Sequence, residues 1–418
     1  MNKYNRKRTI PSPPELMAPA GDWTMLHTAI DSGADAIYFG VDKLNMRAQA
    51  KNFSISELPE ISKYCHSKKI KSYLTLNTII FEDEINEVED IIIKARKSKI
   101  DRIICWDLAA AELCYKHEFP FCISTQGSVS NSLAASVYKK LGAVRIVLAR
   151  ECSLEEIKKI RANTDLEIEV FIHGAMCIAI SGRCFMSHHL FGKSANRGDC
   201  IQPCRREYEI YDKAIDKSLL IGEDYVLSPK DLCTIEFIDQ LIEAGIDSFK
   251  IEGRKRSPEY VAKTVSVYRN AIDSYFRKQL TAEKKKELLA ELEKVYNRGF
   301  STGFYFSKPS SEDYAGIEGS KATTKKTYLG RVLNYYKKSK VTHILIEAGS
   351  VNQNDELIIM GETTGVVELK PGNMLCNDEP ALKAVKGDEV TFQCDNLVRA
   401  RDKVYVVQKV NVEGIISN

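Results

Sequence analysis

The stretch Leu166-Glu-Ile-Glu-Val-Phe-Ile-His-Gly-Ala-Met-Cys177 joins a short apolar run to a glycine and a cysteine. Near-continuous hydrophobicity over a few residues is typical of a strand that is buried in a parallel sheet. Seven other runs of this kind occur before residue 255, and patterns typical of helices separate them. These runs are 15–18, 36–40, 71–77, 102–106, 121–125, 145–149 and 248–252.

Eight strand candidates joined by helical crossovers predict an α/β fold, a TIM-like (β/α) barrel over residues 15–256. Capping boxes at Ser54-Ile-Ser-Glu57 and Ser153-Leu-Glu-Glu156 mark the starts of two connecting helices. An open doubly wound sheet is the alternative, but the number of strands favours the barrel and the first turn has no GxGxxG loop. Residues 173–247 interrupt the alternation. We expect them to form an insertion at the C-terminal mouth of the barrel, where active sites of such barrels lie.

The rest of the chain divides into three parts. Residues 1–14 carry several basic side chains and no secretory signal, so we expect a flexible basic tail. Ser257-Pro258 predicts a helix start, and residues 257–324 form a helical segment and linker. Short β runs with turns over residues 325–418 predict a small C-terminal antiparallel β-barrel.

Composition limits the setting in which the protein works. Lys and Arg exceed Asp and Glu by only three in 418 residues, so any nucleic-acid footprint must be local. No run of about 18 apolar residues occurs, so we expect no membrane span. Twelve cysteines and no secretory signal predict a reducing, cytoplasmic location, where grouped cysteines bind metals more often than they form disulfides.

Four cysteines of the predicted insertion are candidate metal ligands: Cys177, Cys184, Cys200 and Cys233. Grouped thiolates in a reduced protein suggest a metal or iron–sulfur centre. No CxxC pair occurs, so the spacing typical of zinc ribbons and ferredoxins is absent. Inert buried thiols are the alternative. Cys204 is a fifth candidate that could replace one of the four.

Charged side chains cluster at the ends of the last two barrel strands. Glu169 and His173 flank the end of the seventh strand and share one face if side chains alternate. Lys250 and Glu252 repeat the pattern at the eighth strand. We take these four residues as catalytic candidates. A structural histidine and a charge network that closes the barrel are the alternatives.

Arginine and amide side chains at other strand ends are candidate substrate contacts. Arg254 follows the eighth strand and Arg47 follows the second. A lining of Lys and Arg suits a dicarboxylate, since guanidinium geometry matches a carboxylate. Asn77 and Gln126, at the third and fifth strands, are candidate polar contacts.

A local basic segment suggests RNA binding. Residues 321–340 hold seven basic residues, no acidic ones and three tyrosines. Cations contact phosphates and aromatic rings stack on unpaired bases. The candidate RNA contacts are Lys325, Lys326, Arg331, Lys337 and Lys338. A solvated hairpin face is the alternative.

The run Glu169-x-Phe171-x-x-Gly174-Ala-Met-Cys177-x4-Gly182-x-Cys184-x-Met186-Ser187 matches the signature of peptidase family U32, the collagenase-like proteins. Segments 18–22, 196–205, 228–233 and 297–303 also resemble that family. Its better understood members resemble oxygen-independent hydroxylation enzymes. The resemblance implies a 4Fe–4S cluster on Cys177, Cys184, Cys200 and Cys233. It also implies hydroxylation of a tRNA wobble uridine to 5-hydroxyuridine, with prephenate as the hydroxyl source.

Three functions therefore compete. The first is tRNA hydroxylation, with tRNA and prephenate as partners; the family resemblance also allows a paralogous member as a partner. The second is peptide cleavage, for which Cys177 and His173 are the candidate pair, since no GxSxG or HExxH motif occurs. The third is an RNA-binding scaffold without catalysis.

Overall fold

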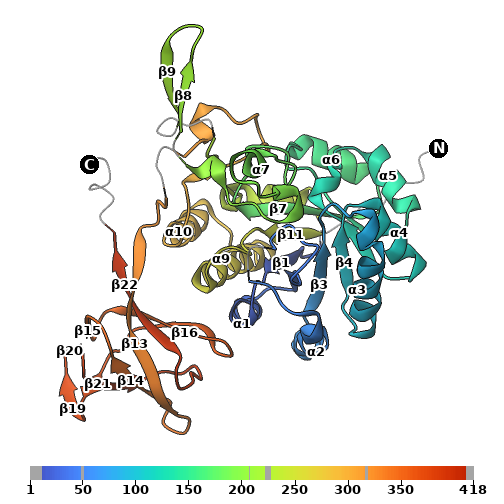
Figure 1. The fold of residues 1–418 in the computed structure, drawn as a ribbon. Coiled ribbons are helices and arrows are strands. Elements are labelled where there is room, and N and C mark those ends of the chain that lie inside the picture. Colours follow the sequence, from blue (N-terminus) through green and yellow to red (C-terminus); the bar gives the residue numbers. More distant parts are fainter. Residues whose placement is uncertain (1–11, 49–50, 207, 222–226, 316–318, 411–418) are drawn as a thin grey trace.

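The computed structural model describes residues 12–410 apart from 49–50, 207, 222–226 and 316–318. Most of the predicted basic tail therefore lies outside the described residues. Figure 1 shows two parts, a barrel surrounded by helices and a C-terminal β domain beside it. Within the described residues, no helix has the length and hydrophobicity that crossing a membrane requires.

The predicted barrel is confirmed, because its eight parallel strands close into a ring. Strand β11 pairs with β7 on one side and with β1 on the other, and the remaining strands pair in chain order. Each predicted apolar run corresponds to one strand. The strands are β1 (Glu15–Pro19), β2 (Ala36–Phe39), β3 (Lys71–Leu76), β4 (Arg102–Cys105), β5 (Phe121–Ile123), β6 (Arg145–Val147), β7 (Glu167–Gly174) and β11 (Ser248–Ile251).

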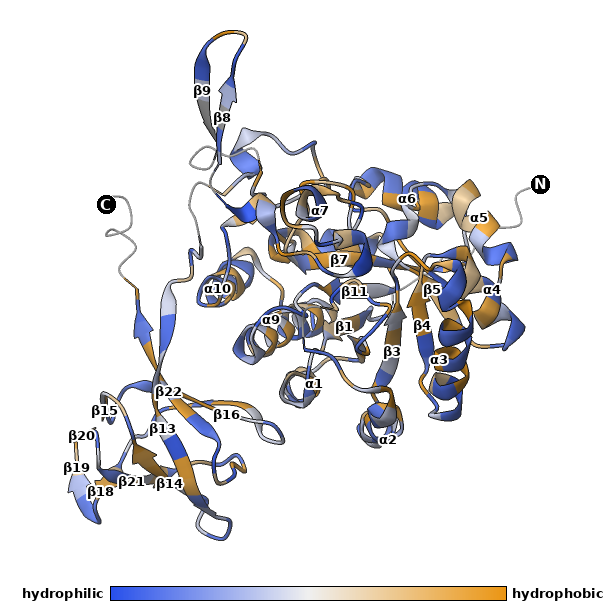
Figure 2. Ribbon diagram, in the orientation of Figure 1, coloured by the Kyte–Doolittle hydropathy of each residue, from blue (hydrophilic) through white to orange (hydrophobic). Residues whose placement is uncertain are grey.

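Helices cover the outside of the barrel and bury their apolar faces against it. In α3, for example, Val88, Ile91, Ile92 and Ala95 are buried while the charged residues lie mostly towards solvent, and Figure 2 shows this mixture of colours. Both predicted capping boxes are present. The helices are α1 (Trp23–Asp31), α2 (Leu58–Ser67), α3 (Ile85–Lys97), α4 (Leu108–Lys116), α5 (Ser132–Lys140), α6 (Leu154–Ala162), α8 (Ile238–Glu243) and α9 (Pro258–Phe276).

The segment between β7 and β11 has two distinct regions. Its first region holds helix α7 (Met186–Phe191), two short 3-10 turns and the hairpin of β8 (Tyr208–Asp212) and β9 (Lys217–Ile221), which projects away from the barrel in Figure 1. Its second region belongs to the barrel wall: β10 (Asp231–Cys233) pairs antiparallel with the end of β7 and parallel with β12 (Phe300–Ser301). This division separates Cys233 from the other cysteines of the segment.

The C-terminal domain is antiparallel, as predicted, and has its own hydrophobic core. It follows α9 and α10 (Ala282–Glu293). Eight strands form one sheet in the order β17-β16-β22-β13-β14-β21-β18-β19, and two more form a separate pair. The strands are β13 (Thr324–Tyr336), β14 (Val341–Ile346), β15 (Ser350–Asn352), β16 (Glu356–Gly361), β17 (Gly365–Leu369), β18 (Met374–Cys376), β19 (Glu379–Ala381), β20 (Lys383–Val385), β21 (Glu389–Gln393) and β22 (Lys403–Lys409).

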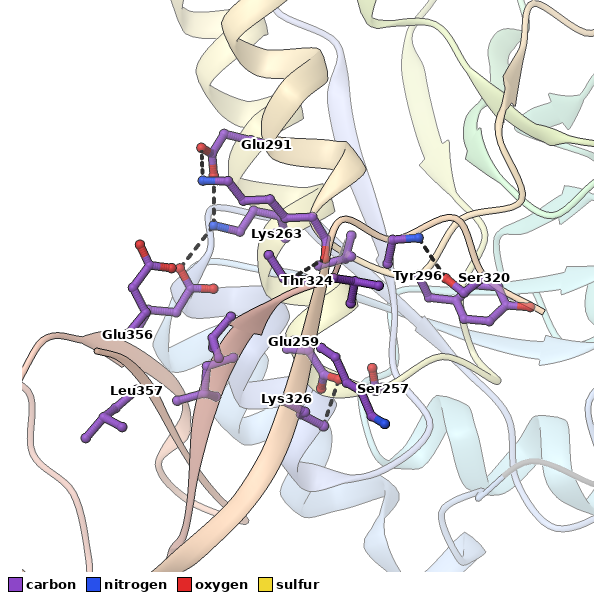
Figure 3. A pocket seen from close by; sticks show the side chains of 18 of the residues that line it. Ser257, Glu259, Lys263, Glu291, Tyr296, Ser320, Thr324, Lys326, Glu356 and Leu357 are labelled. Carbon is purple, nitrogen blue, oxygen red and sulfur yellow. Dashed lines mark hydrogen bonds and ion pairs between the residues drawn. The ribbon is translucent and has the colours of Figure 1, made fainter. Parts of the chain in front are cut away.

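A cavity of about 570 Å³ lies where this domain meets the helices of the barrel. Figure 3 shows ion pairs among its lining side chains. Lys263 pairs with Glu291 at 3.1 Å and with Glu368 at 3.0 Å, and Lys326 pairs with Glu259 at 2.7 Å. Because these charges neutralise one another, the cavity has no strong preference for a charged ligand, and none of the predicted catalytic residues lines it.

Candidate functional site

A pocket at the C-terminal ends of the barrel strands collects six of the eight predicted catalytic and substrate-binding residues. Its lining includes Arg47, Asn77, Gln126, Lys250, Glu252 and Arg254. Arg150 lines it too, directly after the end of the sixth predicted strand, and sequence reasoning missed it. The same rule that selected Arg47 and Arg254, a cation just past a strand end, would have found it. We call this the mouth pocket.

Four cations and one carboxylate line the mouth pocket, and the carboxylate holds one of the cations. Arg47 donates to Glu252 from Nη2 at 3.0 Å and from Nε at 3.3 Å. Tyr38 donates its hydroxyl to the other carboxylate oxygen at 3.2 Å. Burial alone would raise the pKa of Glu252, but Arg47, Arg150 and Arg254 lower it to about 2. Glu252 is therefore an anion at neutral pH that positions Arg47.

Two guanidinium groups of the mouth pocket have no carboxylate within ion-pair distance in the described part of the chain: Arg254 and Arg150. Arg254 donates to Asn45 at 3.1 Å and to Thr75 at 3.2 Å, and burial lowers its pKa to about 10. Arg150 lies 3.9 Å above the ring of Phe171. Arg254 therefore remains charged at neutral pH. Neither guanidinium group is held by a carboxylate at ion-pair distance, so both can contact an anionic ligand.

Four cysteines line a second pocket, which adjoins the first: Cys177, Cys184, Cys200 and Cys204. Cys177 and Arg47 line both pockets. Within the described residues, no three Cys, His, Asp or Glu side chains converge tightly enough to hold a single metal ion. Thiolates around an iron–sulfur cluster lie farther apart, because each one binds a different iron. Thiolates are the ligands that iron–sulfur clusters use, so the chemistry of this donor set fits a cluster.

Comparison with known proteins identifies the family. The model of peptidase family U32 matches residues 21–315. The chain belongs to peptidase family U32. An uncharacterized protease of Methanocaldococcus jannaschii is 44% identical over 94% of this chain and 98% of its own length. A collagenase of Porphyromonas gingivalis is 38% identical over 94% of this chain and 98% of its own. A tRNA hydroxylation protein of Bacillus subtilis is 41% identical over 79% of this chain and 80% of its own.

In this U32 protein Cys233 does not line the pocket that the other three predicted ligands line. It sits in β10, its Sγ is 3.7 Å from the hydroxyl oxygen of Tyr268, and it does not line the cysteine pocket. Burial raises the pKa of its thiol to about 12, and burial raises the pKa of the Cys204 thiol as well. The prediction treated residues 173–247 as one insertion, whereas β10 extends the barrel sheet at the end of β7. Cys204, the fifth candidate, lines the cysteine pocket.

His173 is also displaced from its predicted place. The pairing of β7 with β11 shifts register after Lys250, so that Lys250 lies opposite Phe171 and Ile251 opposite His173. This bulge breaks the alternation on which the prediction rested. The His173 ring packs among Tyr260, Tyr268 and Phe300 at centroid distances of 5.5–5.9 Å, and burial lowers its pKa to about 4.

Glu169 belongs to a buried charge network beneath the mouth pocket. It is fully buried and accepts from Arg145 at 3.0 Å, Lys250 at 2.9 Å and Ser248 at 3.2 Å. Lys250 extends from this network to the mouth pocket, which it lines, and its Nζ lies 4.4 Å from the ring centre of Tyr38. The network that closes the barrel therefore includes Glu169, while Lys250 joins it to the mouth pocket.

The predicted RNA contacts do not form one patch. They are spread along the 13 residues of β13 and the turn after it, a span of about 40 Å. Lys326 is paired with Glu259, and Arg331 is paired with Glu347 at 3.1 Å. Lys325, Lys337 and Lys338 are exposed. The charge of this U32 chain is therefore less concentrated on β13 than the sequence suggested.

Proposed function

We propose that this protein is an RNA-modifying enzyme that hydroxylates a tRNA wobble uridine to 5-hydroxyuridine. The observation that carries the proposal is the sharing of Arg47 and Cys177 between a cationic pocket and a cysteine pocket. A binding site for an anionic co-substrate thus adjoins a set of soft ligands. The similarity to a tRNA hydroxylation protein over most of both chains supports the same function.

The co-substrate in this proposal is prephenate, which would supply the hydroxyl group. Prephenate carries two carboxylates, and the mouth pocket offers two guanidinium groups, Arg150 and Arg254, that have no carboxylate of the described chain within ion-pair distance. Arginine binds carboxylates through paired hydrogen bonds, which fix orientation as well as charge. Glu252 keeps Arg47 in place at the border with the cysteine pocket.

We also propose that a 4Fe–4S cluster binds to Cys177, Cys184, Cys200 and Cys204. These are the cysteines that line one pocket, and their donor type is the one that iron–sulfur clusters use. When bound, such a cluster supplies one-electron transfer beside the mouth pocket. The chain itself positions the pocket: Arg205 donates to the backbone oxygen of Met176 and, at 2.9 Å, to that of Pro229.

Peptide cleavage is the competing function, because two relatives are named as a protease and a collagenase. It would need a base next to Cys177. His173 was the candidate, but it packs in an aromatic enclosure and lines neither pocket. A cysteine–histidine pair of the usual kind is therefore not formed by these two residues.

The test is nucleoside analysis of tRNA. The full chain is expressed without oxygen and with ample iron in a bacterial host whose own tRNA hydroxylation genes are deleted. We expect 5-hydroxyuridine or nucleosides derived from it to appear with the wild type and not with Cys177→Ala. A soluble, iron-loaded protein that leaves the tRNA unchanged would overturn the proposal. Cleavage of denatured collagen that survives iron removal would support the peptidase instead.

A further inference from the structure

Helix α7 and the loop before it expose an unusual number of apolar and aromatic side chains. Phe185 is 64% exposed, Phe191 42% and Ile180 49%. His188 and His189 are exposed as well. Their rings lie close together, with 6.3 Å between the centroids of Phe185 and His189 and 6.1 Å between those of the two histidines. We call these five residues the α7 surface.

The α7 surface is set in a segment without negative charge. Residues 170–198 contain no Asp or Glu, whereas Arg183 and Lys193 are basic, and the third cation, Arg197, pairs with Glu84. The guanidinium of Arg206 lies 4.5 Å above the ring of Phe191. Arg183 lies 4.7 Å above the ring of Trp106 at the barrel mouth. Cations thus lie against aromatic rings in and beside this segment, and such pairs complement a chain of phosphates and bases.

The opposite side of the same helix touches the cysteine pocket. Ser187 is 1% exposed, and its hydroxyl oxygen lies 3.9 Å from Sγ of Cys200. The backbone nitrogen of Met186 lies 3.4 Å from Sγ of Cys184. In the preceding loop Gly182 lines the mouth pocket. The exposed rings are therefore separated from both pockets by a single layer of chain.

We propose that the α7 surface binds unpaired nucleotides of the RNA substrate beside the base that is modified. The inference rests on the proposed function for the identity of the ligand. Stacking of a base on an aromatic side chain strengthens binding and tolerates any sequence. Nucleotides next to a wobble uridine are unpaired, so their faces are free to stack. The segment on β13, by comparison, is long and partly neutralised by Glu259 and Glu347.

The test measures RNA affinity, not activity. A fluorescent tRNA anticodon stem–loop is titrated with the full chain and followed by anisotropy. We expect Phe185→Ala with Phe191→Ala to weaken binding about tenfold or more, as the loss of stacking predicts. The ring-retaining pair Phe185→Tyr with Phe191→Tyr should bind nearly as the wild type. The matched control is Leu108→Ala with Leu133→Ala, which removes side chains that are 62% and 76% exposed on α4 and α5, and binding should not change.

A second set of variants keeps the test valid if the alanine pair folds poorly. The double variant Lys193→Gln with Arg206→Gln should make RNA binding less dependent on salt. The slope of the logarithm of the binding constant against the logarithm of the salt concentration should become smaller in magnitude by about 0.7 for each phosphate that the protein no longer neutralises. Unchanged affinity and unchanged slope in folded variants would overturn the inference. If the variants change the sedimentation of the protein but not its RNA binding, the α7 surface is a protein–protein interface instead. If RNA binding depends on the α7 surface while tRNA stays unhydroxylated, the inference stands and the proposed function fails.

Discussion

Arg47 and Glu252 form an ion pair at the barrel mouth, with 3.0 Å between Nη2 and Oε1. Arg47 follows β2 and Glu252 follows β11, so the pair joins two loops that are separated by more than 200 residues in sequence. The same arginine borders the cysteine pocket. The pair therefore fixes a cation between the proposed co-substrate and the proposed cluster.

The first prediction concerns the pH dependence of stability through Glu252. Its pKa falls from 4.5 to about 2 on folding, so its contribution is complete above pH 4.5 and is lost as the pH falls towards 2. A shift of this size corresponds to about 3 kcal/mol. Glu252→Gln should therefore lower the free energy of unfolding at pH 7 and differ less from the wild type at pH 3. Denaturant titrations at both pH values measure the difference; an equal loss at both would contradict it.

The second prediction concerns Arg254 as a carboxylate ligand. Arg254→Met removes a charge that has no carboxylate of the described chain within ion-pair distance, so the KM for the proposed co-substrate prephenate should rise about tenfold or more. Arg254→Lys keeps the charge but not the paired hydrogen bonds. Its KM should therefore lie between those of the wild type and Arg254→Met. Steady-state kinetics of tRNA hydroxylation measures this. Arg277→Met, at an exposed position after α9, is the matched control. A fall in kcat alone would assign Arg254 a different role.

The sequence predicted the barrel well, because strands buried on both faces appear as continuous apolar runs whatever surrounds them. It also predicted most of the mouth pocket, since strand ends in a closed parallel barrel must meet at one rim. His173 shows the limit of this reasoning. One extra residue at the bulge beside Lys250 turns its side chain away from the rim, and nothing in the local pattern marks that residue.

The cysteines show a second limit. Ligands of one site need only converge in space, so spacing along the chain could not separate Cys204 from Cys233. The pairing of β10 with the end of β7 places Cys233 outside the cysteine pocket, whereas Cys204 lines that pocket. That pairing joins residues about 60 positions apart, and the hydrophobic pattern of β10 is too short to predict it.

The third prediction follows from this placement. Cys204→Ala should lower the iron content of anaerobically purified protein and the absorbance near 400 nm that iron–sulfur clusters give, because one thiolate ligand is removed. Cys233→Ala should keep both, because its thiol hydrogen-bonds to Tyr268 in the core and lines neither pocket. Iron analysis and visible spectra compare the two variants under identical loading. The reverse result would return Cys233 to the ligand set.

The fourth prediction tests how the backbone at the end of β7 supports Glu252. Gly174 has φ +106°, and a Cβ there would lie 2.4 Å from the backbone oxygen of Glu252. Gly174→Ala therefore adds a backbone collision to the strain of a left-handed conformation. Gly192 has φ +64° and no atom within 4 Å of the same position, so Gly192→Ala carries the strain alone, about 1–2 kcal/mol.

We expect Gly192→Ala to lower the melting temperature slightly and to keep tRNA hydroxylation. Gly174→Ala should lower it by at least twice as much. Any folded fraction of Gly174→Ala should also hydroxylate poorly, because the displaced Glu252 no longer holds Arg47. Thermal unfolding and nucleoside analysis of the two variants separate strain from collision. If Gly174→Ala and Gly192→Ala have equal melting temperatures, the chain around Glu252 accommodates the added methyl group. The rigid support inferred for the Arg47–Glu252 pair would then be wrong.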